Sequence, residues 1–368
     1  MEQEHKIERV GWGFGGCDMR CKQCYNASVL QSEQHDFATL KTIADKLAAD
    51  GVKEINYGTG EFIFNANALA LARYLKEQYP LIRQAVTTNG ATIILLEPIE
   101  IARLFNDIDI SIDFPNPEEH NRFRQHPMAW SFVERSLRIL TEIGMERSIV
   151  TCVTSETKDH HVKEFLELAK RFGAAWRINW FRNTGRGKEY LRISAKRAWQ
   201  ILKLLTDENV LFESLSDPLF APLVSRPEKN PSPGCVCGKL SCRIQTDLRV
   251  TPCVFLKGAW AGGSIKDKTL AELYESEPFR ALRERLPNFC VQSGCEALET
   301  CRGGCASRAV LHSGQLSLPD DYCPYFQNEP EKSETLALVE SVRANIKFID
   351  KPKTKVHDGY LCTVIVKP

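Results

Sequence analysis

The chain has 368 residues, of which 43% are hydrophobic and 26% charged, and its formal net charge is +1. This is the composition of a globular protein long enough for about two domains. So balanced a charge excludes a broad basic field for nucleic acid or an anionic membrane. No run approaches the roughly 18 apolar residues of a membrane span, and residues 1–8 lack the apolar region of a signal peptide. We therefore expect a cytoplasmic protein with no nucleic-acid and no membrane partner.

The first half of the chain alternates apolar strands with amphipathic helices. Strands are predicted at 6–14, 52–61, 82–90, 107–114, 147–155 and 175–187, the last running into a loop, and helices at 36–51, 66–80, 98–106, 131–144 and 161–173. Roughly six β-α units with short loops indicate an α/β fold, in which helices wrap a parallel sheet that is open or partly closed into a barrel. Ligands of such sheets bind at the carboxyl ends of the strands.

The second half is organised differently. Helical patterns at 194–208 and 215–224 precede a proline-rich break at 226–234, and a cysteine-rich part extends to about residue 330. A helix at 333–349 and an edge strand within 359–368 are predicted to follow. The expected units are 1–195, a helical linker at 196–233, 234–330 and 331–368.

Three cysteines, Cys17, Cys21 and Cys24, follow the first predicted strand with the spacing C-x3-C-x2-C. A four-iron cluster held by three thiolates leaves one iron without a protein ligand, so that this iron can bind a small molecule directly. The alternatives are a zinc site that borrows a distant ligand, or unrelated buried cysteines. The position of the loop, at the ligand-binding edge of the predicted sheet, favours the open cluster.

This loop, with Tyr25 after it, resembles that of the radical S-adenosylmethionine (SAM) enzymes. The resemblance implies a partial (β/α)6 barrel and a [4Fe-4S] cluster whose open iron binds SAM. It also implies that one electron from the cluster cleaves SAM to a 5′-deoxyadenosyl radical, which abstracts a hydrogen atom from the substrate. Four later loops resemble the SAM-binding loops of the family, although Phe62 replaces a frequent proline. The implied SAM-site residues are Gly58, Thr59, Gly60, Glu61, Asn89, Ser111, Asp113, Arg182 and Arg186.

The C-terminal cysteines resemble the SPASM extension of the same family, a small domain with two auxiliary [4Fe-4S] clusters. The implied ligands are Cys242, Cys253, Cys305 and either Cys235 or Cys237 for one cluster, and Cys290, Cys295, Cys301 and Cys323 for the other. Four residues rather than two separate Cys290 from Cys295, and Leu248 stands where a glycine is usual. Structural zinc is the alternative for this region.

The resemblance implies a radical SAM/SPASM oxidoreductase with a flavodoxin- or ferredoxin-type electron donor. A ribosomally made peptide is the first expected substrate, to be cross-linked, epimerised or oxidised; a small molecule or tetrapyrrole is the alternative. Only sixteen residues precede Cys17, so we expect no N-terminal leader-binding domain, and a separate leader-binding protein is a candidate partner. Cys152 would be the hydrogen donor in an epimerisation, or simply a small buried residue. From other classes, a non-enzymatic electron carrier and a zinc-stapled binding protein stay open.

Overall fold

The computed structural model describes residues 7–27, 35–225, 230, 235–350, 355–356 and 363–368. Cys362 and most of the proline-rich break at 226–234 lie outside these described residues. Among the helices of the described part, none combines the length and the apolarity that crossing a membrane demands.

One twisted sheet runs through the molecule, in the order β10-β9-β8-β1-β2-β3-β4-β5-β6-β11-β7. Strands β1 to β6 are parallel, and β8 adds to β1 in the same direction. β11 runs antiparallel to both of its neighbours. The strands are β1 (Arg9–Gly13), β2 (Glu54–Thr59), β3 (Arg83–Thr88), β4 (Asp107–Ser111), β5 (Arg147–Val153), β6 (Ala175–Trp180), β7 (Leu211–Leu215), β8 (Ser241–Ile244), β9 (Arg249–Thr251), β10 (Gly263–Ser264) and β11 (Thr363–Lys367).

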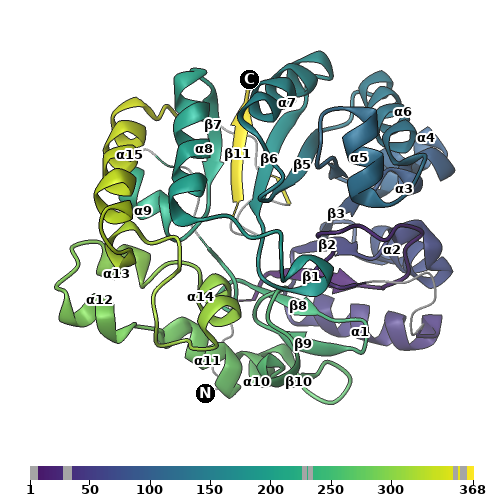
Figure 1. Ribbon diagram of the computed structural model, residues 1–368. Coiled ribbons are helices and arrows are strands. Elements are labelled where there is room, and N and C mark those ends of the chain that lie inside the picture. Colours follow the sequence, from purple (N-terminus) through teal and green to yellow (C-terminus); the bar gives the residue numbers. More distant parts are fainter. Residues whose placement is uncertain (1–6, 28–34, 226–229, 231–234, 351–354, 357–362) are drawn as a thin grey trace.

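Helices cover the outer face of the curved sheet, and the cysteine-rich part lies beside β1 and β8 (Figure 1). The expected α/β barrel is therefore confirmed, followed by a smaller, mostly helical cysteine-rich region. The helices are α1 (Phe37–Ala49), α2 (Ala66–Gln78), α3 (Ala91–Leu95), α4 (Pro98–Leu104), α5 (Pro117–Arg124), α6 (Ala129–Glu142), α7 (Asp159–Arg171), α8 (Ala195–Asp207), α9 (Phe220–Val224), α10 (Leu270–Tyr274), α11 (Glu277–Glu284), α12 (Asn288–Gln292), α13 (Leu298–Cys301), α14 (Ala306–Ser313) and α15 (Glu331–Asn345).

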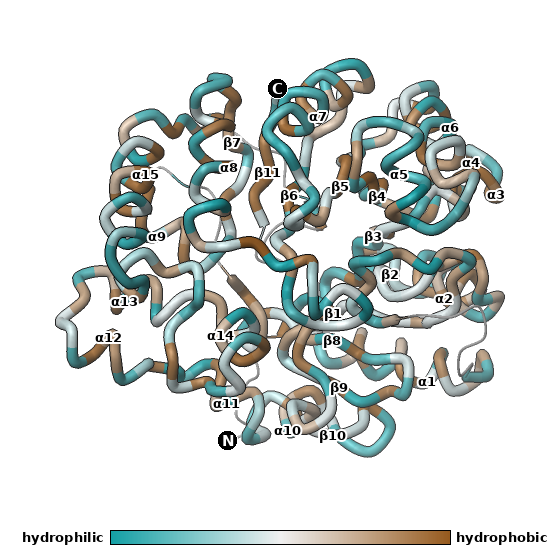
Figure 2. Tube along the Cα trace, in the orientation of Figure 1, coloured by the Kyte–Doolittle hydropathy of each residue, from teal (hydrophilic) through white to brown (hydrophobic). Residues whose placement is uncertain are grey.

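Side chains alternate between the two faces of each barrel strand, because the period of a strand is two residues. In β4, Ile108 and Ile110 join the main hydrophobic core, whereas Ser111 lines an internal cavity. In β6, Trp176 and Ile178 join the same core, and Arg177 lines the cavity. In Figure 2 the tube is brown along much of β5 and β11, and teal residues are frequent on the outer helices. The barrel interior is therefore the polar side of the sheet, where ligands can bind.

Two strands of the second half differ from expectation. The C-terminal strand, predicted at an edge, is β11, which lies between β6 and β7 and pairs with both (Figure 1). Val364 and Val366 are fully buried in the main core, which explains the apolar run in the sequence. β7, at Leu211–Leu215, was not predicted; its own alternation is weak, since four of its five residues are buried.

The central position of β11 leads to a stability prediction. Replacing Val364, which is 0% exposed, by alanine should lower the free energy of unfolding by about 2 kcal/mol, because the core around it cannot fully collapse into the cavity. Urea unfolding of the reconstituted protein measures this change. Leu81→Ala, at a residue 92% exposed, is the matched control and should change stability by less than about 0.5 kcal/mol. Equal effects at both positions would contradict the burial of β11.

Candidate active site

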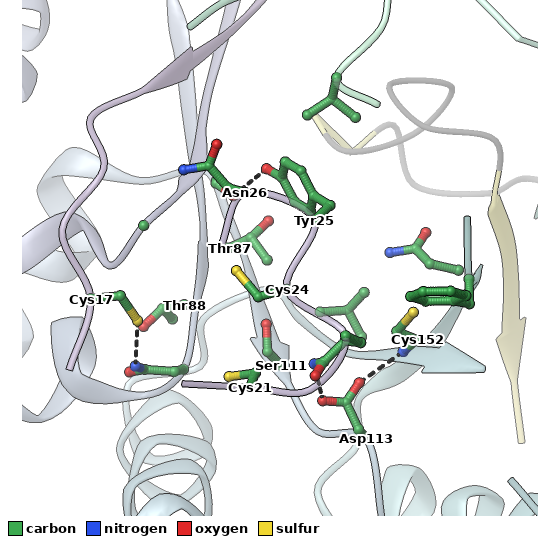
Figure 3. Close-up of a pocket in the computed structure, with 18 of the residues that line it drawn as sticks. Cys17, Cys21, Cys24, Tyr25, Asn26, Thr87, Thr88, Ser111, Asp113 and Cys152 are labelled. Carbon is green, nitrogen blue, oxygen red and sulfur yellow. Dashed lines mark hydrogen bonds between the residues drawn. The ribbon is translucent and has the colours of Figure 1, made fainter. Parts of the chain in front are cut away.

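A cavity of about 1200 Å³, counted out to its open mouth, lies at the carboxyl ends of the parallel strands. The loop after β1 forms one wall with Cys17, Cys21 and Cys24, and side chains from β2 to β6 form the rest. Figure 3 shows the three sulfur atoms in this cavity with Thr88, Ser111 and Cys152 around it. The structure thus brings the predicted cysteine loop and most of the predicted SAM-binding residues into one place.

The cysteine loop is held against the barrel by polar contacts. Cys21 is buried, whereas Cys17 and Cys24 are partly exposed. Burial raises the pKa of the Cys17 and Cys21 thiols, and the Arg124 guanidinium, 3.7 Å from the Cys21 sulfur, opposes the rise at Cys21. Iron favours the thiolate form of its ligands, so cluster binding would offset this cost. Three cysteines on one cavity wall fit a cluster with one open iron.

Gly60 is the point of closest approach between the cysteine loop and the loop after β2. Its φ is +81°, a conformation that favours glycine, and an added Cβ would lie 2.1 Å from the carbonyl oxygen of Gly15. The next residue, Glu61, donates its backbone N–H to the carbonyl of Gly16 at 2.6 Å. No side chain fits at Gly60 without separating the two loops, and this explains the glycine in the motif.

Glu61 is buried, and both of its carboxylate oxygens face hydrogen-bond donors. Oε1 accepts from the hydroxyls of Thr88 and Thr92 and from the Thr92 N–H at 3.0 Å. Oε2 accepts from the Asn89 N–H at 2.7 Å. Burial raises the pKa of Glu61, and these hydrogen bonds oppose the rise. The carboxylate is thus fixed in orientation at the cavity wall, and Oε2, with fewer partners, can accept from a bound ammonium group.

Asn89 and Tyr25 reinforce this wall. The Asn89 amide donates to Asp18 at 2.8 Å and lies 3.8 Å from the Cys17 sulfur. The Tyr25 hydroxyl contacts the Gly58 carbonyl at 3.1 Å and the Thr59 hydroxyl at 2.9 Å. Both Tyr25 and Gly58 line the cavity, whereas Thr59, predicted to bind SAM, is buried and serves as a hydrogen-bond partner behind it.

Asp113 connects three parts of the site. Its Oδ2 accepts from Gln23 of the cysteine loop at 2.6 Å and from Arg124 of α5 at 2.7 Å. Its Oδ1 accepts from the Cys152 N–H of β5 at 3.0 Å (Figure 3). Burial raises the pKa of the Asp113 carboxyl, and the Arg124 charge opposes that rise. With these partners Asp113 positions the cysteine loop.

The two arginines expected near an adenine are placed differently from each other. Arg182 lines the cavity, where it stacks on Phe255 at 4.7 Å and contacts the Cys305 sulfur at 3.6 Å. Arg186 does not line this cavity but donates to the Cys21 carbonyl at 3.3 Å. Arg186 therefore supports the cysteine loop from outside.

Behind Phe255 is a second cavity, lined by five of the C-terminal cysteines. They are Cys235, Cys237, Cys253, Cys301 and Cys305. Hydrogen bonds with Cys235 and Cys253, followed by burial, raise the pKa of the Cys237 thiol well above its usual range. Cys242, expected among the ligands, does not line this cavity: it lies on β8, and its side chain is in the main hydrophobic core.

The physical reason for this difference is strand alternation. Arg243 and Cys242 are neighbours on β8, so they face opposite sides of the sheet. Arg243 lines the first cavity, which leaves Cys242 on the apolar face. Leu248, at the position where a glycine is usual, has a φ of +61°, so the tight turn is kept without a glycine.

The remaining cysteines form a separate group. After burial, the nearby charge of Cys295 raises the pKa of the Cys290 thiol, and the charge of Cys290 is among the causes that raise the pKa of Cys301 and Cys323. Burial is the first cause of the raised pKa of Cys290 and Cys301. The four residues predicted for the second auxiliary cluster are therefore neighbours in space.

Several site residues could not be identified from motifs. For Arg124 the sequence gives only a weak indication of a role in the site, namely a basic residue shortly after the fourth predicted strand. Gln23, Arg177 and Asn179 have the strand or loop positions of site residues but no motif of their own. Arg243 becomes visible only once β8 is known to pair with β1.

Comparisons with known proteins agree with this geometry. Residues 13–169 match the model of the radical SAM superfamily, and residues 235–306 match SPASM, an iron–sulfur cluster-binding domain. Together these domains account for most of the cavity and for the cysteine-rich region. The chain belongs to the radical SAM superfamily and carries a SPASM domain; it is a radical SAM enzyme.

Three relatives of this chain are named for different products. The AdoMet-dependent heme synthase of Methanosarcina barkeri is 26% identical over 343 residues, covering 86% of this chain and 96% of that protein. The mycofactocin maturase MftC of Mycolicibacterium smegmatis is 26% identical and covers 83% and 80%. The subtilosin biosynthesis protein AlbA of Bacillus subtilis is 24% identical and covers 85% and 69%.

Solved structures show the same fold. SuiB of Streptococcus suis with bound S-adenosylmethionine superposes with a TM-score of 0.67 at 16% identity, covering 86% of this chain and 77% of that chain. The anSMEcpe structure with bound AdoMet and a peptide superposes with a TM-score of 0.66 at 20% identity, covering 92% and 99%.

The position of Cys242 yields a prediction on iron content. Cys242→Ala should keep the full iron and sulfide content after anaerobic reconstitution, because its side chain lines neither of the two cavities. Cys237→Ala combined with Cys253→Ala should lose about four irons, the content of one cubane cluster. Colorimetric iron and sulfide counts measure both variants. A loss of about four irons in Cys242→Ala would contradict the placement.

Proposed function

We propose that this radical SAM enzyme matures a ribosomally made peptide. Cys17, Cys21 and Cys24 would hold the open cluster, with Glu61 and the Gly58–Gly60 loop binding the methionine part of SAM. When bound and reduced, cluster and SAM together supply a 5′-deoxyadenosyl radical that takes a hydrogen atom from the substrate. The chain's own residues would fix the cofactor and present the substrate.

The observation that carries the proposal is the contact between the two cavities. Phe255 lines both of them, and Arg182 reaches from the first cavity to the sulfur of Cys305 in the second. We propose Cys235, Cys237, Cys253 and Cys305 as the ligands of the nearer auxiliary cluster. Such a cluster, next to the substrate cavity, is placed to accept an electron from a substrate radical, and a flavodoxin- or ferredoxin-type protein would supply the electron that starts the reaction.

The open mouth of the cavity supports a substrate that extends beyond it. The cavity is partly open to solvent, so one segment of a chain can enter it while the rest of the substrate stays outside. AlbA and MftC are named for bacteriocin biosynthesis and a maturase activity, and one SuiB structure is bound to its precursor peptide. A peptide segment entering through the open mouth agrees with these features, and a separate leader-binding protein would be its natural carrier.

A second candidate substrate is a tetrapyrrole side chain. It is favoured by the heme synthase of Methanosarcina barkeri, which this chain matches over 96% of that protein's length. The same radical chemistry would apply, and the two candidates differ in what occupies the mouth of the cavity. Incubation with a tetrapyrrole or with a precursor peptide from a neighbouring gene, followed by mass spectrometry, separates them.

The basic activity can be tested without a substrate. Anaerobically reconstituted protein given dithionite and SAM should release 5′-deoxyadenosine, measured by liquid chromatography. The triple variant Cys17→Ala, Cys21→Ala, Cys24→Ala should release none, because no ligand remains for the open cluster. Cys242→Ala, outside both cavities, is the matched control and should keep the activity. If wild-type protein with its full iron content released no 5′-deoxyadenosine, the result would indicate a non-enzymatic electron carrier. If the protein bound no iron, the result would indicate a zinc-stapled binding protein.

For an epimerisation, we propose Cys152 as the hydrogen-atom donor. Its thiol lines the cavity next to Asp113, and it is partly exposed. Burial raises the pKa of the Cys152 thiol, so the group is protonated at neutral pH and has a hydrogen atom to give. A thiolate could not do this.

Replacing Cys152 by alanine tests this role. The variant should still form 5′-deoxyadenosine with substrate present, while the stereocentre of the recovered substrate remains unchanged. Chiral amino-acid analysis and deuterium uptake from D₂O measure the outcome. Cys152→Ser, which keeps the size but holds its hydrogen more strongly, should behave like alanine. Full epimerisation by either variant would remove Cys152 from the mechanism.

A further inference from the structure

Arg177 is a buried cation in the interior of the barrel. It lies in the middle of β6, is 1% exposed, and lines the first cavity. Its Nη1 forms an ion pair with Asp109 of β4, on the far side of the intervening strand β5. An arginine is costly to bury, so all of its N–H groups are expected to have partners.

One edge of the Arg177 guanidinium has no hydrogen-bond partner among the described residues. Within the described part of the chain, Nε and Nη2 of Arg177 have no hydrogen-bond partner, although both are fully buried. Nε–H and Nη2–H point the same way from one edge of the planar group, and this edge binds a carboxylate through two parallel hydrogen bonds. Asp109 pairs with Nη1, so the edge formed by Nε and Nη2 stays available for a ligand. We propose that Arg177 binds a carboxylate group of the substrate.

Two neighbours complete the subsite. Asn179, two residues later on the same face of β6, also lines the cavity, and its Oδ1 lacks a partner among the described residues. This oxygen can accept an N–H from the same substrate. Arg243 enters from β8, donates Nη2 to the Thr59 hydroxyl, and its Nε is buried without a partner in the described structure.

The charges in the cavity also favour an anion. Arg124 and Arg177 are paired with Asp113 and Asp109, whereas Arg243 has a neutral hydroxyl as its partner. Glu61, the other buried carboxylate on the wall, is surrounded by four donors. Arg182 also lines the cavity, so four arginines face these three carboxylates, and one anionic group near Arg177 and Arg243 would balance the fourth positive charge.

This subsite lies beside the SAM-binding residues. Arg177 pairs with Val150, and Val150 pairs with Ser111, so Arg177 is level with one residue expected to bind SAM and lies two strands away from it. A measurement of SAM affinity therefore distinguishes a substrate carboxylate from the carboxylate of SAM. The inference rests on the proposed function, because it concerns what is placed next to the cofactor, and it narrows the substrate to one with a carboxylate in the barrel.

The test compares acids with their amides on the SAM-saturated, reconstituted enzyme. The probes are N-acetyl-Ala-Ala as free acid and as amide, and the side-chain pair N-acetyl-Ala-Glu-amide and N-acetyl-Ala-Gln-amide, titrated calorimetrically. At least one acid should bind about tenfold or more tightly than its amide, which is what a charged hydrogen-bond pair contributes. Preference within the first pair indicates a C-terminal carboxylate, and preference within the second indicates an acidic side chain.

Two variants locate the effect. Arg177→Lys keeps a charge for Asp109 but removes the paired N–H edge, and should lose most of the preference for the acid. Arg177→Gln with Asp109→Asn removes both charges of this ion pair and should bind acid and amide equally. Arg138→Lys, on the exposed face of α6, is the matched control. SAM affinity should stay the same in all of them.

The outcomes separate this inference from the proposed function. Equal binding of acid and amide by the wild-type enzyme, or an acid preference unchanged in both Arg177 variants, overturns the carboxylate subsite. 5′-Deoxyadenosine release is measured in the same samples, and its absence from the wild type would overturn the proposed function instead. A loss of SAM affinity that parallels the loss of acid binding would assign Arg177 to the cofactor and also overturn the inference.

Discussion

The contact between two backbones, at Gly60 and Gly15, determines where the chemistry of this protein can take place. An added Cβ at Gly60 would lie 2.1 Å from the Gly15 carbonyl, so the two loops can meet only with a glycine there. This approach sets the Glu61 carboxylate and the three cysteines on adjoining walls of one cavity. The remaining contacts of the cysteine loop, through Gln23 and Asn89, hold it in that position.

Polar residues inside the barrel are the second constraint. Helices cover the outer face with apolar contacts, while the inner face carries Asp109, Ser111 and Arg177, whose groups must find partners within the barrel or in a ligand. Most of them find partners in the protein. The inner-face residues that lack partners, such as Arg177, face the cavity. Their unpaired polar atoms therefore mark the surface that a substrate would cover.

Much of this arrangement was predictable from the sequence, and the unpredicted parts share a cause. The cysteine spacing, the glycine loop and the alternation through Ser111 and Asp113 are local patterns, and most of the residues they single out meet at one cavity. The face of the sheet on which Cys242 lies and the central position of β11 depend on which strands become neighbours across long stretches of chain, and a local pattern does not contain that information. Arg177 had no motif, since an inward arginine in an apolar strand becomes meaningful only when its partners are known.

The insertion of β11 between β6 and β7 has a consequence for folding. Roughly 180 residues separate β6 from β11, so this pairing closes one of the longest loops in the molecule and is slow to form. β1, which leads into the cysteine loop, gains β8 as its second neighbour from roughly 230 residues later in the chain. Strands β2 to β5 pair through much shorter connections. Both ends of the parallel sheet therefore gain their second neighbours late, and the pocket between them is completed only when the distant C-terminal half has been made.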